Sequence, residues 1–340
     1  MGKVENSIEK KVRKWSARFP SLERLAVYFD KKKAINVDYL SQIYPNDAEI
    51  KRLQASAQIA YQSLLHDIHE SDDYAIPKTI WIYWDKGLEA APDLVKEAYD
   101  SWKVMNPEYE VRFLDEKNVQ DYFDFNALFH KSSIDIGIAH KSDFIRVYLL
   151  SRFGGVWVDS TTWCWKSLDE WLPQETEQCG FFVFKQPSTR VDRQIKNWFI
   201  ASSKGNPITL GLLKELTGFN FKSRRHTLRV MKTKEYRHIT GLSQEGTGFE
   251  VLKLIEQIGG YPYFYFHYLF NEVVKQGKPQ RLWAIAKQTI NAHTNTGSEI
   301  NDALVSKQNY KAKYRASLEY QQRLTLMNQL KEKKQSIVNK

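Results

Sequence analysis

The segment 141–161 constrains the fold of this chain more than any other part of its sequence. Residues 141–153 have the apolar spacing of a helix, and Gly154 and Gly155 end that helix. The next three residues, 156–158, are apolar and indicate a buried strand, which is followed directly by the polar residues 159–161. A helix that turns through glycine into a buried strand is typical of an α/β sheet, whose strand ends bind ligands.

Further strands and helices are expected on both sides of this segment. The runs 79–84 and 109–114 are rich in β-branched and aromatic residues, and a helix over 92–105 separates them. Strand, helix and strand in this order predict a parallel βαβ unit. After residue 161 we expect a strand at 181–184, a helix near 194–202 and another helix near 250–258. The predicted fold class is therefore α/β, with a mixed and mainly parallel central sheet.

The 340 residues divide into three regions by pattern. Residues 1–75 read as a helical N-terminal extension, 76–300 as the catalytic α/β domain, and 301–340 as a basic C-terminal region with a helix over 307–335. Two interpretations of that last helix stay open, which are packing onto the catalytic domain and docking on a membrane surface.

Charge and cysteine content bear on location and partners. The net charge is +10, and basic residues gather in 1–40, 222–239 and 307–340, which favours a polyanionic partner. Neither Cys164 nor Cys179 has a metal-binding or redox spacing, so we expect reduced structural thiols. Charges interrupt the first 15 residues, and no apolar run approaches the roughly 18 residues of a membrane-spanning helix. We therefore expect a cytoplasmic protein.

Three charged residues form the strongest candidate catalytic site. Asp143 and Arg146 are three positions apart on the predicted helix and share a face, while Asp159 follows the next strand. A nucleotide-sugar donor needs its diphosphate neutralised, and carboxylate oxygens such as those of Asp159 suit Mg²⁺ or Mn²⁺. Arg146 is expected to hold a phosphate or a sugar hydroxyl, and Asp143 to accept hydrogen bonds from ribose or hexose. The plainer interpretation of Asp143 and Arg146 is a structural ion pair.

Other candidate donor-binding residues adjoin this centre. Trp84 and Tyr83 end the first strand, where Trp84 would stack on the nucleobase unless it belongs to the core. Ser160 and Thr161 follow Asp159 and are assigned to the donor, with Thr161 also assigned to the metal. Taken alone, this triplet is more often a turn or a helix cap than a metal site.

Four ordered motifs resemble the capsular polysaccharide synthesis proteins of glycosyltransferase family 32, which have the GT-A fold. They are Ile-Pro-Lys-Thr-Ile-Trp at 76–81 with Trp84, Lys-Ser-Asp-Phe-Ile-Arg at 141–146, Gly-Gly-Val-Trp-Val-Asp-Ser-Thr at 154–161, and Tyr-Phe-His-Tyr-Leu-Phe-Asn at 265–271. Together they span roughly residues 76–295, and the agreement of four motifs in one order is far more specific than any one of them.

The resemblance implies an activity that the residues alone do not. It implies a UDP-sugar donor, transfer of a hexose such as galactose or glucose with retention, and a lipid-linked oligosaccharide acceptor. It also implies a residue near the C-terminal end of the catalytic domain that binds the metal or the diphosphate, and His293 is the candidate. His267 is interpreted as a core histidine. The wider family has Asp-x-Asp where this chain has Asp159-Ser160-Thr161, and the neutral Thr161 would bind Mn²⁺ or Mg²⁺ more weakly.

Two other functions compete with the transferase. One is a catalytically silent carbohydrate-binding or scaffold protein of the same fold, suggested by Thr161 in place of an acid. The other is a basic nucleic-acid-binding protein, but the chain has no recognisable nucleic-acid-binding motif and no nucleic-acid partner is expected. The basic termini are instead expected to meet an anionic membrane surface, placing the protein on the inner face of the cell membrane.

Overall fold

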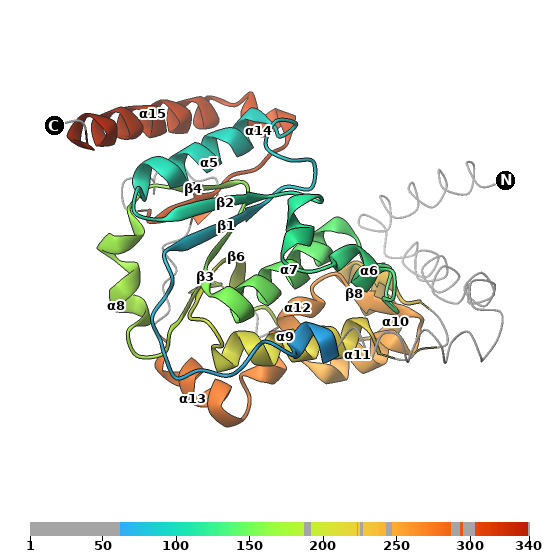
Figure 1. The fold of residues 1–340 in the computed structure, drawn as a ribbon. Coiled ribbons are helices and arrows are strands. Elements are labelled where there is room, and N and C mark those ends of the chain that lie inside the picture. The colour runs from blue at the N-terminus through green and yellow to red at the C-terminus, as the bar shows by residue number, and fades with distance from the viewer. Residues whose placement is uncertain are drawn as a thin grey trace, which may run out of the picture.

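The fold is built around a five-stranded sheet (Figure 1). It is seen in a computed structural model that describes residues 62–186, 192–222, 224, 227–242, 247–286, 293–294 and 303–338. The predicted helices of residues 1–61 lie outside this range. The sheet has the strand order β2-β1-β3-β6-β5. Its strands are β1 (Thr79–Tyr83), β2 (Glu110–Leu114), β3 (Gly155–Asp159), β5 (Phe181–Lys185) and β6 (Ile195–Ser202).

The directions of these strands confirm a mixed, mainly parallel sheet. Strand β1 pairs in parallel with β2 and with β3, whereas β6 is antiparallel to both β3 and β5. Four of the five strands therefore run one way and β6 runs against them. The crossover from β1 to β2 contains α5 (Asp93–Met105), as the predicted βαβ unit requires.

The predicted helix near 194–202 is wrong, because this segment forms strand β6. It contains branched and aromatic residues, and most of its length is buried between β3 and β5. Pairing on both edges decides its conformation, since tertiary context overrides weak local preferences. The other helix of that region, predicted near 250–258, is confirmed as α11 (Phe249–Glu256).

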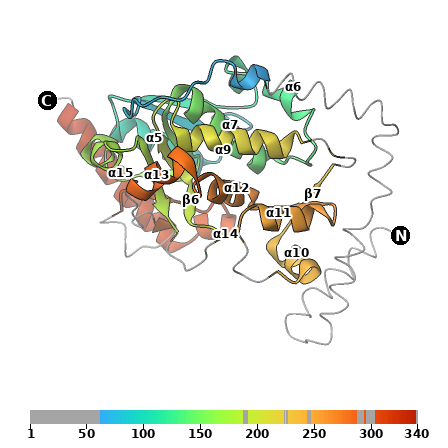
Figure 2. The same cartoon turned by 90° about the horizontal axis from the view of Figure 1, so that it is seen from below.

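Helices cover both faces of the sheet, because alternate side chains of each strand point to opposite sides. Ile80 and Val156 belong to one buried cluster, together with Trp102 of α5. Trp81 and Trp157 belong to another, together with residues of α7 (Ile138–Phe153), α9 (Pro207–Asn220) and α12 (Tyr265–Val273). Figure 2 shows α9 beside α7, with which it is in contact.

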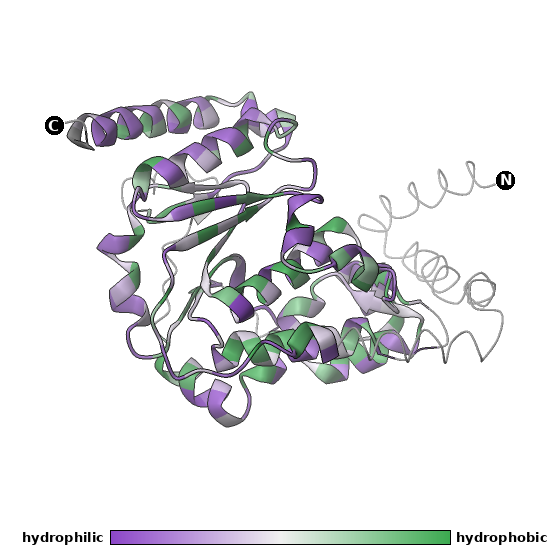
Figure 3. Cartoon of the chain, in the orientation of Figure 1, coloured by the Kyte–Doolittle hydropathy of each residue, from purple (hydrophilic) through white to green (hydrophobic). Residues whose placement is uncertain are grey.

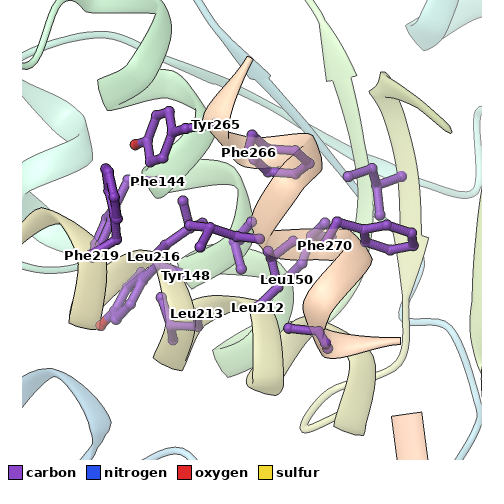
Figure 4. Close-up of a cluster of buried hydrophobic side chains, with 14 of the residues drawn as sticks. Phe144, Tyr148, Leu150, Leu212, Leu213, Leu216, Phe219, Tyr265, Phe266 and Phe270 are labelled. Atoms are coloured by element: carbon purple, nitrogen blue, oxygen red, sulfur yellow. The ribbon is translucent and has the colours of Figure 1, made fainter. Parts of the chain in front are cut away.

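The second cluster is dominated by aromatic and leucine side chains that α7, α9 and α12 contribute (Figure 4). The cluster includes Phe144 and Tyr148 of α7, Leu213 of α9 and Phe270 of α12. Burying a side chain of this kind contributes about 1.5–3 kcal/mol, so the cluster fixes α7 firmly against its neighbours. A rigid α7 matters because it carries Asp143 and Arg146.

The C-terminal region packs on the other face of the sheet. A strand, β10 (Val305–Lys307), and a short helix, α14 (Ala312–Arg315), precede α15 (Leu318–Val338), so a continuous helix from residue 307 is wrong. Helix α15 lies along α5, where Lys331 forms an ion pair with Glu97 at 2.7 Å (Figure 1). Hydrophilic and hydrophobic residues alternate along it (Figure 3). The helix thus packs onto the catalytic domain, which was one of the two interpretations given for it; docking on a membrane surface was the other.

The remaining elements complete the described part of the chain. The strands are β4 (Thr162–Cys164), β7 (Arg229–Met231), β8 (Gly260–Pro262) and β9 (His293–Thr294), and the helices are α6 (Phe125–Phe129), α8 (Leu172–Thr176), α10 (Thr233–Thr240), α13 (Gly277–Ile285) and the 3₁₀ turns Asn118–Asp121 and Leu168–Glu170. Both cysteines are buried, and each thiol donates a hydrogen bond to a backbone carbonyl oxygen, Cys164 to that of Lys166 and Cys179 to that of Phe181. Among the described helices, none has the length and apolar character needed to cross a bilayer.

Candidate active site

The candidate site lies where β1 and β3 end, on the face covered by α7. The register of the sheet sets Tyr83 opposite Asp159, the last residues of the two strands. Alternation directs both residues to the side of Trp81 and Trp157, which is the side of α7. The sheet and helix therefore bring Asp159 to Arg146, as the sequence spacing predicted.

Arg146 links the two predicted carboxylates. Its Nη1 donates to Asp143 Oδ1 at 2.7 Å and its Nη2 donates to Asp159 Oδ1 at 2.7 Å. The side chain is only 3% exposed, and its guanidinium lies over the Trp157 ring at 5.0 Å from the ring centre. The charged hydrogen bonds and the stacking together fix the planar guanidinium group in one orientation.

Asp159 also binds a cation from a distant part of the chain. Its Oδ2 accepts a short hydrogen bond from Lys307 Nζ, and its Oδ1 accepts a second bond from Trp157 Nε1 at 3.2 Å. Burial alone would raise the pKa of Asp159, but the charges of Lys307 and Arg146 outweigh burial and lower the pKa to about 2. The carboxylate is therefore ionised at neutral pH.

A cavity of about 730 Å³ opens beside these groups. This volume is in the range of pockets that hold ligands of nucleotide-sugar size. The cavity lining includes every predicted site residue whose side chain the structure describes, namely Tyr83, Trp84, Asp143, Arg146, Asp159, Ser160 and Thr161. The backbone of His293 is in β9, which pairs with β10, but its side chain lies outside the described residues.

Trp84 reaches the cavity while packing against the hydrophobic core. It is partly buried against the cluster that includes Leu94, Trp163 and Met327, on the α5 and α15 side of the sheet. Tyr83 points the other way, and burial, with nearby carboxylates, raises the pKa of its hydroxyl. Both residues line the cavity, so the two interpretations of Trp84, core and base-stacking, are compatible.

The oxygen atoms proposed for a metal ion already have donors. Arg146 and Trp157 bind Asp159 Oδ1, and Lys307 binds Asp159 Oδ2. Thr161 is neutral and buried, and the described residues contain no group of three or more His, Cys, Asp or Glu side chains arranged to hold a cation. As they are placed here, these residues do not fit Mn²⁺ or Mg²⁺ unless Lys307 leaves Asp159. Metal binding at Asp159 and Thr161 stays a prediction.

Lys307 and Asn197 are site residues that sequence reasoning missed. Asn197 of β6 donates from Nδ2 to Asp143 Oδ1 at 3.0 Å, but its segment was expected to be a helix. Lys307 was counted among the charges of the basic C-terminal helix. The only local signal for Asn197 is the branched and aromatic content of its strand, and no local signal marks Lys307.

His267 of α12 also lines the cavity, in addition to being buried as expected of a core histidine. Burial, helped by the charges of Arg193 and Arg146, lowers its pKa to about 3. Its Nδ1 has no hydrogen-bond partner among the described residues. The imidazole is therefore neutral at pH 7 and suited to a sugar hydroxyl rather than to a phosphate.

Protonation of His267 should make stability depend on pH. Its pKa in the folded protein is below the unfolded value of 6.5, so below pH 6.5 the unfolded chain binds more protons and stability decreases as pH falls toward 3. We expect the free energy of unfolding to lose about 2 kcal/mol from this group between pH 8 and pH 5. Urea denaturation at a series of pH values measures the loss. His267→Gln should flatten this decline, whereas substitution of the exposed His130 should not; parallel declines in wild type and His267→Gln would contradict the assignment.

Comparisons with known proteins agree with the motifs. An O-glycosyltransferase, braB, of Annulohypoxylon truncatum is 28% identical over 151 residues, which cover 38% of this chain and 34% of the relative. The initiation-specific alpha-1,6-mannosyltransferase of Candida albicans is 24% identical over 184 residues, or 46% of each chain. The chain thus spans about a third to a half of these relatives.

One solved structure, described as PaToxG Glycosyltransferase, aligns with 76% of this chain and 84% of its own, at 14% identity and a TM-score of 0.34. A likeness of this size adds nothing to the fold described above.

A match to a protein family covers more of the chain than either relative does. Residues 31–227, more than half of the chain, match the family described as capsular polysaccharide synthesis protein. This match includes the strands and the helix that bring Asp143, Arg146 and Asp159 together, and the chain belongs to the capsular polysaccharide synthesis protein family.

Proposed function

We propose that this protein is a glycosyltransferase of family 32 and GT-A type, which moves a hexose from a UDP-sugar to a lipid-linked oligosaccharide during surface polysaccharide synthesis. The observation that carries the proposal is the guanidinium of Arg146, which bridges Asp143 and Asp159 at the wall of the 730 Å³ cavity. Fixed charges at the carboxyl ends of parallel strands are suited to a polar ligand. Relatives whose names include glycosyltransferase support the same class.

The residues around the cavity suit the parts of such a donor. Tyr83 and Trp84 offer aromatic surface to a base, while Asp143 accepts hydrogen bonds from hydroxyl groups. Ile138, Tyr263 and Tyr310 line the cavity but are 53%, 43% and 60% exposed, so they lie where it opens to solvent. Aromatic side chains in that position suit stacking of an acceptor sugar.

We propose that transfer retains the anomeric configuration through attack on the face from which the diphosphate leaves. The bond between the anomeric carbon and the phosphate oxygen breaks, the acceptor oxygen bonds to that carbon, and the acceptor proton passes to the departing phosphate oxygen. Arg146, held by two carboxylates, orients the donor and needs no rearrangement as charge develops. No covalent sugar–enzyme adduct is expected, so trapping one during a single turnover would contradict this step.

Donor turnover by wild type and Asp159→Ala tests the activity. The purified protein is incubated with a panel of UDP-, GDP- and dTDP-sugars, in parallel with Mn²⁺ and with EDTA, and nucleoside diphosphate release is followed. We expect slow hydrolysis of one UDP-hexose and a loss of about 100-fold or more in Asp159→Ala. Asp169→Ala is the matched control, because Asp169 forms an exposed pair with Lys78. Absence of turnover, together with no thermal stabilisation by any donor, would favour the silent scaffold.

We also propose that the protein binds the anionic inner face of the membrane through its basic segments. Leu318 and Leu326 of α15 are 74% and 41% exposed, and the same helix carries Lys331, Lys333 and Lys334, a combination that suits a lipid surface. Each exposed Lys or Arg near such a surface adds about 1 kcal/mol of attraction. Flotation with liposomes of increasing anionic lipid content measures this binding, and flotation that is independent of anionic lipid would contradict it.

A further inference from the structure

Lys307 stands at the position where a sugar transferase of the proposed type is expected to place its divalent cation. Its ammonium group binds Asp159 Oδ2 and its side chain, one third exposed, lines the cavity. The third position of the expected acidic motif is Thr161, which has no charge to share with a metal. The structure thus places a cation at Asp159 that belongs to the chain itself.

The backbone of Lys307 is fixed from two directions. Strand β10 sets it opposite Thr162 of β4 and opposite Thr294 of β9. The next residue, Gln308, donates its backbone N–H to the carbonyl oxygen of Thr161 at 2.8 Å. The segment that carries Lys307 is therefore aligned with the residues that follow Asp159.

Side chains of α14 and α15 hold the same segment. Gln308 Oε1 accepts hydrogen bonds from Arg323 Nη1 at 3.1 Å and from the Tyr314 hydroxyl at 2.6 Å. Arg323 is fully buried, and its ion pair with Glu319 at 3.4 Å and its bond to Gln308 offset the cost of burying its charge. These contacts fix the backbone and leave the Lys307 side chain as the part that can move.

Asp159 does not depend on Lys307 to remain paired. If Lys307 leaves, Asp159 Oδ1 keeps its bonds from Arg146 and Trp157. A carboxylate that retains a buried guanidinium avoids most of the penalty of an isolated buried charge. Moving the ammonium from this carboxylate to a diphosphate, which carries more negative charge, is favourable on Coulombic grounds.

We propose that Lys307 takes the place of the divalent cation, moving from Asp159 Oδ2 to the diphosphate of the nucleotide-sugar donor. This inference rests on the proposed function and adds to it that the chain itself neutralises the leaving nucleoside diphosphate. Binding of that diphosphate then needs Lys307 and does not need Mn²⁺ or Mg²⁺. Lys307 acts by direct contact with the donor.

Isothermal titration calorimetry with UDP, GDP and dTDP, each with EDTA and with Mn²⁺, tests the proposal on the full chain. Wild type is expected to bind one of them equally well in both buffers. Lys307→Met, which keeps the length of the side chain but not its charge, should weaken diphosphate binding about 10- to 100-fold in EDTA. Binding of the matching monophosphate should change far less, because the lysine contacts the diphosphate. Lys307→Arg should restore most of the affinity.

Lys278→Met is the matched control, because Lys278 forms ion pairs with Glu70 and Asp72, which do not line the cavity. Thermal unfolding of each variant checks that the protein is folded. If wild type binds the diphosphate only with Mn²⁺, or if Lys307→Met binds as wild type does, the inference is overturned and the proposed function stands. If wild type binds none of the three diphosphates in either buffer, the proposed donor and this inference both fail.

Discussion

Substitution of Arg146 by methionine is expected to lower the free energy of unfolding by about 3–5 kcal/mol, because it removes the partner of two buried carboxylates. Among the described residues, Asp143 would keep its hydrogen bond from Asn197, and Asp159 would keep Lys307 and Trp157. The loss should be smaller at pH 5 than at pH 7, because burial already raises the pKa of Asp143, and without Arg146 this carboxyl takes up a proton more readily in the folded protein than in the unfolded chain. Urea denaturation at pH 7 and pH 5 measures both effects.

Arg152→Met provides the matched comparison for this variant. Arg152 is on the same helix, but its partner Asp67 is exposed to solvent, so loss of their ion pair at 3.1 Å should cost far less stability than loss of Arg146. Arg146→Lys keeps a positive charge but not the fork that reaches both carboxylates, and we expect an intermediate stability with donor turnover still strongly reduced. Equal stability of Arg146→Met and wild type would show that the two carboxylates do not need this cation.

Substitution of Gly155 by alanine is expected to lower the free energy of unfolding by about 3 kcal/mol. Gly155 has φ near 100°, and an added Cβ would lie 2.5 Å from the carbonyl oxygen of Thr79 in the adjacent strand. The backbone strain and the clash each contribute, since neither the glycine conformation nor the neighbouring strand has room to change. Thermal unfolding with urea titration measures the loss.

Gly218→Ala is the control for the glycine variant. Gly218 is in the exposed part of α9, and an added Cβ there meets nothing within 4 Å. Alanine should stabilise this helix by up to about 1 kcal/mol. Opposite signs at the two glycines are the expected result. A neutral Gly155→Ala would mean that the turn between α7 and β3 adapts easily.

The centre of the site was predictable because it depends on local geometry. The spacing of Asp143 and Arg146 on one helix, the glycine turn and the short strand ending at Asp159 are all contained in about 20 residues. Their side-chain directions follow from the periods of a helix and of a strand, and the structure brings them together as expected.

The rest of the site depends on contacts that no local pattern contains. Lys307 is 148 residues from the carboxylate that it binds. Strand β6 was mistaken for a helix, because its conformation follows from its place between β3 and β5 and not from its own period. Asn197 was missed for the same reason. The sequence was enough to name several residues that line the cavity, but it did not reveal Lys307.

The pairing of β10 with β4 also has a consequence for the order in which the protein is assembled. The residues of β1, α7 and β3 emerge from the ribosome early, whereas Lys307 and Gln308 follow about 150 residues later, and Arg323 later still. A nascent chain can form the sheet and the Arg146 cluster before it has the strand that closes the site beside them. The wall of the cavity next to Asp159 can therefore be completed only after Lys307 has been synthesised, 148 residues after Asp159.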